Sequence, residues 1–132
     1  MQRQRVSTGT PWESQYGYSR AIRSGPFVFV SGTTATDAQG NVIACGDPYE
    51  QTVYILDKIR TALDACGATL RDVVCTRAYL VNVDDWPEVA RAHARSFADV
   101  RPAATLVEVR RLVDPRLLVE MEVQAVVDEA SC

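Results

Sequence analysis

The sequence has few of the residues that bind nucleic-acid phosphates. Its 132 residues include one lysine, Lys58, and the only adjacent basic pair is Arg110 and Arg111. The formal net charge is −3. Because a phosphate backbone is bound by clustered Lys and Arg side chains, we expect no nucleic-acid partner, and the composition disfavours a nuclease.

Metal-ligand patterns are also missing. The chain has one histidine, His93, and its four cysteines stand far apart without a CxxC pair: Cys45, Cys66, Cys75 and Cys132. A zinc site needs a set of such ligands at short spacings. We therefore predict no metal and expect most of the cysteines to be small buried hydrophobes.

Long apolar runs are absent as well. No stretch reaches the roughly 18 apolar residues of a membrane-spanning helix, and residues 1–10 lack the apolar core of a secretory signal. The composition is ordinary for a globular protein, with 47% hydrophobic and 23% charged residues. We expect a single cytoplasmic domain over residues 1–132, with no membrane partner.

The clearest local pattern is a helix over residues 47–67. Asp47 suits the N-cap, Pro48 the first helical position and Glu50 the third, which together form a capping-box pattern. Gly67 suits the left-handed residue that ends a helix. The predicted apolar stripe is Tyr49, Val53, Leu56, Ile59, Leu63 and Cys66.

A second helix is predicted to begin at Asp85, with Glu88 three residues later. Its spacing predicts that the helix buries Trp86, Val89, Ala90, His93 and Phe97. His93 is therefore expected to be a packed, hydrogen-bonded histidine and not a catalytic one.

The remaining segments predict strands, at residues 18–23, 26–31, 72–82, about 104–111 and 117–127. In the last of these, apolar and polar side chains alternate: Val119, Met121, Val123 and Ala125 on one face, and Glu120, Glu122 and Gln124 on the other. The order of elements predicts an α+β fold, a mixed β-sheet with two α-helices packed on one face.

The other face of this sheet is left without a helix. It is expected to show Leu106 and Leu118 beside the acidic Glu108, Glu120 and Glu122. Such a face is either plain solvated surface or a contact with other subunits, and the residues alone do not choose between the two.

Three segments together resemble one family. They are FVFVSGTTA (27–35), LDACGATLRDVVCTRAYLVNVDDW (63–86) and RPAATLVEVRRLVDPRLLVEMEV (101–123). Their order and spacing resemble the Rid family, the YjgF/RidA group that is also named endoribonuclease L-PSP, from about Tyr18 to Val127. The resemblance implies a chorismate-mutase-like fold and a homotrimer with a ligand cleft at each subunit boundary, where the mixed face would be partly buried.

The segment RPAATL departs from the deaminase branch of this family. In that branch the Pro-Ala pair is followed by an arginine that binds the substrate carboxylate bidentately, whereas this chain has Ala104. The next inward residue, often cysteine, is Leu106, and an amide on the second helix corresponds to about Ala90. The resemblance therefore implies a more apolar cleft and a protein that is not a standard 2-aminoacrylate deaminase.

Other positions match the family. Tyr18 corresponds to the aromatic residue that closes the cleft, and Gly32 and Thr33 to the segment whose backbone lines it. Glu120 corresponds to the acid associated with the catalytic water. As a base it would need partial burial or a well-positioned water. The alternative, which fits Glu122 better, is a carboxylate at a subunit contact.

Arg20 is a second candidate for anion binding. Tyr18 and Arg20 stand two residues apart on a predicted strand and would share a face, so Arg20 could bind an anion from another side of the cleft. The alternative is that Arg20 is solvated or pairs with Glu120 or Glu122.

These features predict a small trimeric hydrolase or deaminase of imine or enamine-like metabolites that needs no cofactor. Water would attack a C=N bond, with Glu120 orienting or deprotonating it and Tyr18 positioning the substrate. The expected substrate-binding positions are Arg20, Gly32, Thr33, Ala104 and Leu106. Two alternatives stay open: a non-catalytic small-molecule binder or sensor and, less favoured, the endoribonuclease of the family's older name.

Overall fold

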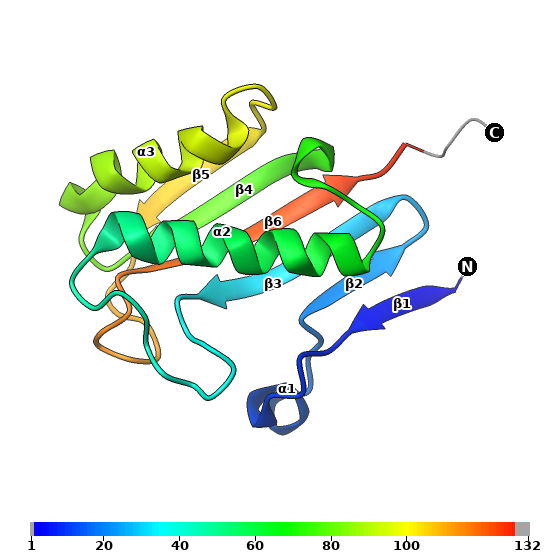
Figure 1. The fold of residues 1–132 in the computed structure, drawn as a ribbon, viewed down its shortest axis with the longest axis horizontal. Coiled ribbons are helices and arrows are strands. Elements are labelled where there is room, and N and C mark those ends of the chain that lie inside the picture. Colours follow the sequence, from blue (N-terminus) through cyan, green and yellow to red (C-terminus); the bar gives the residue numbers. More distant parts are fainter. Residues whose placement is uncertain (1, 129–132) are drawn as a thin grey trace.

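The computed structural model describes residues 2–128, which form one sheet with two long helices on the same face (Figure 1). The strands are β1 (Arg3–Val6), β2 (Ala21–Ser24), β3 (Phe27–Thr34), β4 (Val73–Leu80), β5 (Ala103–Glu108) and β6 (Val119–Val126). The helices are α1 (Pro11–Tyr16), α2 (Pro48–Ala65) and α3 (Trp86–Phe97), with short 3-10 turns η1 (Leu70–Asp72) and η2 (Val83–Asp85). None of the helices in residues 2–128 is long and apolar enough to cross a membrane.

The sheet has six strands in the order β1-β2-β3-β6-β4-β5. β4 and β5 pair in parallel, and the other neighbours pair antiparallel. Both α2 and α3 lie across one face (Figure 1). The structure thus confirms the predicted α+β fold with a mixed sheet and two helices on one face.

The N-terminal β1 and α1 are not indicated by the sequence pattern. β1 is the mostly exposed stretch RQRV, which has no apolar alternation, and α1 has only six residues, too few for an apolar stripe. The predicted strand 18–23 begins only at Ala21. Tyr18 and Arg20 therefore lie in the loop between α1 and β2, and not on a strand.

Helix α2 begins and ends as its sequence predicts. The Asp47 side chain accepts a hydrogen bond from the Glu50 N–H at 3.0 Å, and Pro48 opens the helix. Gly67, with φ of 73°, follows the C-cap. The buried face is rotated from the predicted stripe: Ile55 and Ala62 are buried, whereas Tyr49 and Val53 are half-buried.

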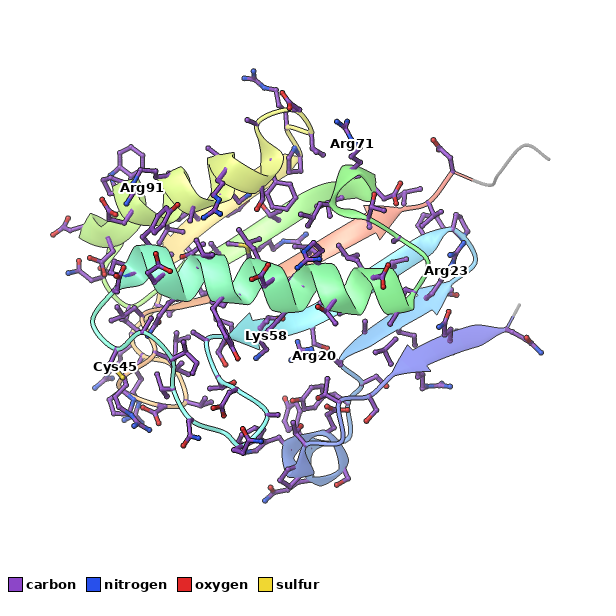
Figure 2. The ribbon with its side chains drawn as sticks, in the orientation of Figure 1. Arg20, Arg23, Cys45, Lys58, Arg71 and Arg91 are labelled. Atoms are coloured by element: carbon purple, nitrogen blue, oxygen red, sulfur yellow. The ribbon has the colours of Figure 1, made fainter. Side chains whose placement is uncertain are left out.

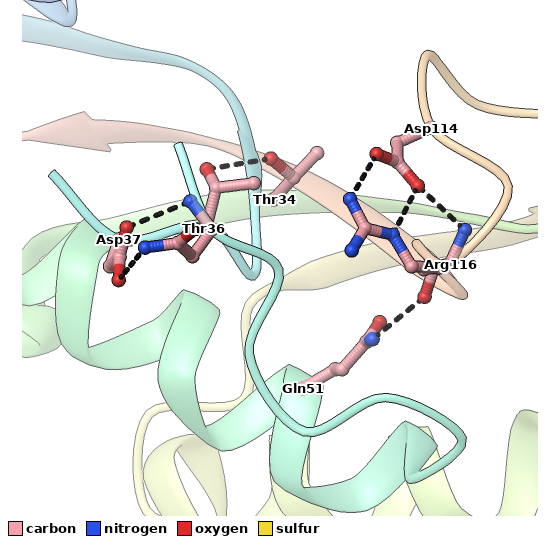
Figure 3. A network of polar contacts seen from close by, with 7 residues as sticks. Thr34, Thr36, Asp37, Gln51, Asp114 and Arg116 are labelled. Carbon is pink, nitrogen blue, oxygen red and sulfur yellow. Dashed lines mark hydrogen bonds and ion pairs between the residues drawn. The ribbon is translucent and has the colours of Figure 1, made fainter. Parts of the chain in front are cut away.

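A buried amide on α2 fixes the chain just before β6. Gln51 is fully buried, its Nε2 donates to the Arg116 carbonyl oxygen at 3.0 Å, and its Oε1 accepts from the Leu118 N–H at 2.9 Å. Asp114 pairs with the Arg116 side chain at 2.8 Å in the same loop (Figure 3). Because β6 starts at the next residue, these contacts fix the position from which Glu120 projects.

Strand β6 alternates as predicted, with its apolar residues buried beneath the helices and its acidic residues half-buried on the other face. The prediction that Leu106 lies on the face without helices is wrong. In the parallel register Leu106 pairs with buried Ala78 and packs against the core. The alternation of β5 alone could not assign its faces, because the register with β4 decides them.

The face without helices carries other apolar side chains. Phe27 and Phe29 on β3 are 50% and 42% exposed, and Val107 on β5 is 41% exposed. Phe29 pairs with Gln124, and Tyr79 pairs with both Val107 and Glu120, so these residues share the uncovered face. The mixed apolar and acidic face expected from the sequence is present, but Glu108 is not part of it: like Leu106, it pairs with a buried residue of β4, Leu80, and lies on the side of the helices.

Helix α3 buries Val89 and Phe97 as predicted, and the half-buried His93 contacts the Thr76 hydroxyl at 2.9 Å. Trp86, however, is 55% exposed, because it opens the helix and the packed stripe starts one turn later. The half-buried Ala90 takes little part in that stripe.

The cysteines are less uniformly buried than expected. Cys66 is buried and Cys75 half-buried, but Cys45 is exposed in the loop before α2. Cys132 lies outside the described residues.

Candidate functional site

A cavity of about 1120 Å³ opens between the N-terminal segment, the end of β3 with its following loop, α2, and the loop before β6. Four of the predicted site residues line it: Tyr18, Arg20, Gly32 and Glu120. Lys58 of α2 lines it too, and Figure 2 shows Lys58 and Arg20 next to each other below that helix. Among residues 2–128, no group of His, Cys, Asp or Glu side chains could hold a metal ion.

The Glu120 carboxylate lies directly over Gly32. A methyl group on Gly32 would come within 2.1 Å of Glu120 Oε2. The approach is possible because β3 carries a register shift between Val30 and Thr33, which displaces Gly32 from the regular pairing with β6. Gly32 therefore creates the space that the carboxylate occupies.

The environment of Glu120 favours proton transfer. Burial raises the pKa of its carboxyl; the positive charge of Arg20 lowers it, and the negative charge of Glu122 raises it. In the part of the chain that the structure describes, no hydrogen bond reaches the Glu120 carboxylate. Its oxygens remain available to a water or a ligand in the cavity.

Arg20 holds the shifted segment of β3 in place. Its Nη2 donates to the carbonyl oxygens of Ser31 and Gly32 at 2.5 and 2.7 Å, and to Thr33 Oγ1 at 3.0 Å. Arg20 forms no ion pair with Glu120 or Glu122 in residues 2–128, and burial lowers its pKa. Neither the solvated nor the ion-paired alternative therefore describes Arg20.

Thr33 supports the cavity from behind. Its side chain is buried, and its hydroxyl donates to the Ser31 carbonyl oxygen at 2.8 Å while accepting from Arg20. Ser31 in turn donates from its hydroxyl to the Ser19 carbonyl oxygen at 2.7 Å. These contacts join β3 to the loop that carries Tyr18.

Lys58 belongs to the site but was not found from the sequence. Its Nζ donates to the Thr34 and Thr36 carbonyl oxygens at 2.8 and 2.9 Å and to Thr36 Oγ1 at 3.3 Å. Burial lowers the pKa of Lys58 to about 8, assisted by the charge of Arg20 and opposed by that of Asp37. The only hint in the sequence is that Lys58 precedes Ile59 and so lies at the edge of the apolar stripe, where a lysine is partly covered.

Glu13 fixes another side of the cavity. It is 7% exposed, and its carboxylate accepts from the hydroxyls of Ser7, Thr8 and Thr10 and from the Thr8 N–H. Burial raises the pKa of Glu13, but these donors outweigh it and hold the value at about 2. The backbone N–H of Tyr18 also donates to the Glu13 carbonyl oxygen, at 2.9 Å. Thr8, Thr10 and Tyr18, which all line the cavity, thus depend on Glu13.

Two predicted site residues lie elsewhere in the chain. Ala104 is exposed on the outermost strand β5, and Leu106 packs against the core. Neither lines the cavity that contains Glu120. Within one chain, the structure therefore gathers Tyr18, Arg20 and Glu120 but not Ala104 and Leu106.

Comparison with known proteins agrees with this architecture. The family model described as Endoribonuclease L-PSP matches residues 9–127. A crystal structure from Mycobacterium tuberculosis, of a member of the YjgF/YER057c/UK114 family, is 44% identical, covers 96% of this chain and 100% of its own, and has a TM-score of 0.87.

Two curated relatives extend the comparison. An uncharacterised Streptomyces coelicolor protein is 40% identical over 122 residues, 92% of this chain and 90% of that protein. The Acinetobacter baylyi protein named 3-aminoacrylate deaminase RutC is 33% identical over 104 residues, 79% of this chain and 82% of that protein. The chain therefore belongs to the YjgF/RidA family, as its sequence motifs predict.

Proposed function

We propose that this protein hydrolyses imine or enamine-like metabolites and releases ammonia. The observation that carries this proposal is Glu120: a half-buried carboxyl of raised pKa, without a protein hydrogen-bond partner in residues 2–128, that faces a cavity. Carboxyl groups in such surroundings are suited to general acid and base catalysis near neutral pH.

The chemistry needs a proton carrier and no cofactor. An enamine first gains a proton on carbon from the acid form of Glu120 and becomes a protonated imine. Glu120, then a carboxylate, takes a proton from water as the water oxygen bonds to the C=N carbon. Glu120 returns this proton to the nitrogen, the C–N bond breaks while the hydroxyl proton passes back to Glu120, and ammonia and a carbonyl product leave.

The other cavity residues position the substrate. Tyr18 presents an aromatic ring and a hydroxyl beside the path to Glu120, and the backbone around Gly32 and Thr33 offers polar groups next to the carboxylate. Arg20 keeps this backbone shifted from the regular ladder. A substrate bound here would meet Glu120 in a fixed orientation, which is the main requirement for an imine that already hydrolyses in water.

We further propose that the working site lies between subunits of a homotrimer in the cytoplasm. Ala104 is exposed and lies away from Glu120 within one chain, so it would reach the cleft from a neighbouring subunit. Association would also cover Phe27, Phe29 and Val107 on the uncovered sheet face, as is typical of apolar subunit contacts. Since Ala104 has no charge, the preferred substrate differs from 2-aminoacrylate.

The relative named 3-aminoacrylate deaminase supplies the first substrate to try. The test follows ammonia release from enzymatically generated 3-aminoacrylate, relative to the spontaneous rate. We expect wild-type acceleration, loss of that acceleration in Glu120→Gln, and retention in the matched control Glu122→Gln on the same strand face. Binding of small molecules by a wild type that accelerates no imine or enamine hydrolysis would instead support the binding or sensing alternative.

A further inference from the structure

Arg20 is a half-buried cation with unused hydrogen-bond donors. Its Nη2 has two N–H groups and serves three acceptors in the Ser31–Thr33 segment. Its Nε is buried without a hydrogen-bond partner, and Nη1 makes no hydrogen bond within residues 2–128. No carboxylate of the described chain lies within ion-pair distance of Arg20.

The charge of Arg20 has no ion-pair partner within residues 2–128, which is unusual for a charged group held away from water. A buried charge is normally paired, and a guanidinium normally directs its free N–H groups at a carboxylate or phosphate. Holding the bent segment of β3 requires only Nη2. Nη1 is left free, and no carboxylate of the described residues forms an ion pair with Arg20, although Glu13 and Glu120 attract it at longer range. The free Nη1 therefore points to an anionic group supplied from the cavity.

The neighbouring charges support the same conclusion. The Glu13 carboxylate already accepts four hydrogen bonds from Ser7, Thr8 and Thr10, and Asp37 accepts from the Gln39 and Asn41 backbone. These charges, and that of Glu120, attract Arg20 or Lys58 only at longer range and form no ion pair with them.

Lys58 contributes positive charge to the cavity but no free hydrogen-bond donor. Its three ammonium hydrogens are matched by three acceptors on Thr34 and Thr36, so the side chain is fixed in place. The repulsion between Lys58 and Arg20 is relieved when an anion binds near both.

We propose that Arg20, in the same subunit as Glu120, anchors a carboxylate of the substrate through the free N–H groups of Nη1, while Lys58 adds positive potential. The reaction assigned to that carboxylate substrate rests on the proposed function, but its binding does not. The anchor then stands on a different side of the cleft from position 104, so the reacting carbon is placed differently from that of a substrate held by an arginine there.

Equilibrium binding of a matched pair of probes tests the proposal. Propanoate and propanamide have nearly the same shape and differ in charge, and their binding is followed by NMR titration of the full-length protein. We expect propanoate to bind at least about tenfold more tightly than propanamide, because charged hydrogen bonds to a carboxylate are strong. Equal affinities, or no saturable binding of propanoate, would overturn the inference.

Two variants on α2 distinguish the charge of Lys58 in the cavity from the net charge of the protein. Lys58→Met is expected to weaken propanoate about two- to fivefold more than it weakens propanamide, because only the anion loses the attraction of the lysine charge. Arg60→Met removes the same charge from an exposed position of that helix and is expected to change neither probe. An equal loss of propanoate affinity in both variants would assign the effect to net charge and contradict the inference.

Arg20 itself is tested with a stability readout. Arg20→Gln is expected to abolish the preference for propanoate, and Arg20→Lys to retain a part of it. Thermal melting and propanamide binding report whether the β3 segment has kept its structure. If Arg20→Gln melts like wild type and still prefers propanoate, Arg20 is not the anchor. Because these measurements involve no turnover, a failure to release ammonia would count against the proposed function alone.

Discussion

The Glu120 carboxylate occupies the position in which any side chain on Gly32 would lie. A Cβ on residue 32 would stand 2.1 Å from Glu120 Oε2. Gly32 does not have a positive φ, so its backbone suits other residues as well. The glycine is therefore required for the placement of the carboxylate and not for a special backbone conformation.

Gly32→Ala is accordingly expected to separate activity from stability. The added methyl group displaces the flexible end of Glu120, so ammonia release is expected to fall about ten- to a hundredfold. The free energy of unfolding is expected to change by less than about 1 kcal/mol, because no backbone strain is introduced. Denaturant unfolding and steady-state assays measure the two quantities. Full activity in Gly32→Ala would show that Glu120 does not need this position.

The pH dependence of the reaction is expected to follow Glu120. If Glu120 is the base, activity falls as pH drops through its raised pKa. The charge of Glu122 raises that pKa, so Glu122→Gln is expected to move the acidic limb of the pH–rate profile to lower pH. Tyr79→Phe is the matched control, since Tyr79 donates a hydrogen bond to Glu122 and its removal leaves the negative charge. A limb that moves upward in Glu122→Gln would exclude Glu120 as the titrating base.

Glu13 is expected to make acid stability depend on the N-terminal segment. Its pKa in the folded chain is about 2, below its ordinary value of 4.5. The stabilisation is therefore complete above about pH 4.5 and is lost as pH falls toward 2. Glu13→Gln is expected to unfold about 1–2 kcal/mol more easily at pH 7 and to show a flatter pH profile below 4.5. Denaturant melts across this range measure both effects; parallel profiles for the two proteins would contradict the assignment.

The elements that carry strong local signals are predictable from the sequence. The capped start of α2 and the alternation of β6 were enough to place Glu120 on the face opposite the helices. Lys58 and the true neighbours of Leu106 were not predicted, because a long side chain's contacts and a parallel register depend on segments far away in the sequence. Glu13 was missed since its acceptor role depends on how the loop at 7–10 folds back over it.

Assembly is expected to depend on the uncovered sheet face. Light scattering of the wild type at low micromolar concentration is expected to give about three times the chain mass of 14.6 kDa. Phe29→Arg places a charge on the exposed apolar part of that face and is expected to shift the mass toward one chain. Ala65→Arg, at an exposed position of α2, is the control. A monomeric wild type would exclude both the trimer and the cleft between subunits.

Position 104 is expected to control which substrate is accepted. Ala104 is exposed on β5 and pairs with Thr76, so an arginine can replace it without disturbing the core. We expect wild type to be poor with 2-aminoacrylate, and Ala104→Arg to gain about ten- to a hundredfold from a charged contact to its carboxylate. The gain is expected to be incomplete, because the apolar side chains of Leu106 and Ala90 offer the substrate no further polar contact.

The double variant Ala104→Arg with Glu120→Gln shows whether the gained activity uses the same base. It is expected to lose the gain entirely, because substrate binding alone moves no proton. The measurement is ammonia release from enzymatically generated 2-aminoacrylate above the spontaneous rate, with light scattering to confirm unchanged assembly. If wild type already equals a relative that has the arginine, position 104 does not set specificity. If the double variant keeps the gain, another group activates the water, because a glutamine at position 120 cannot accept its proton.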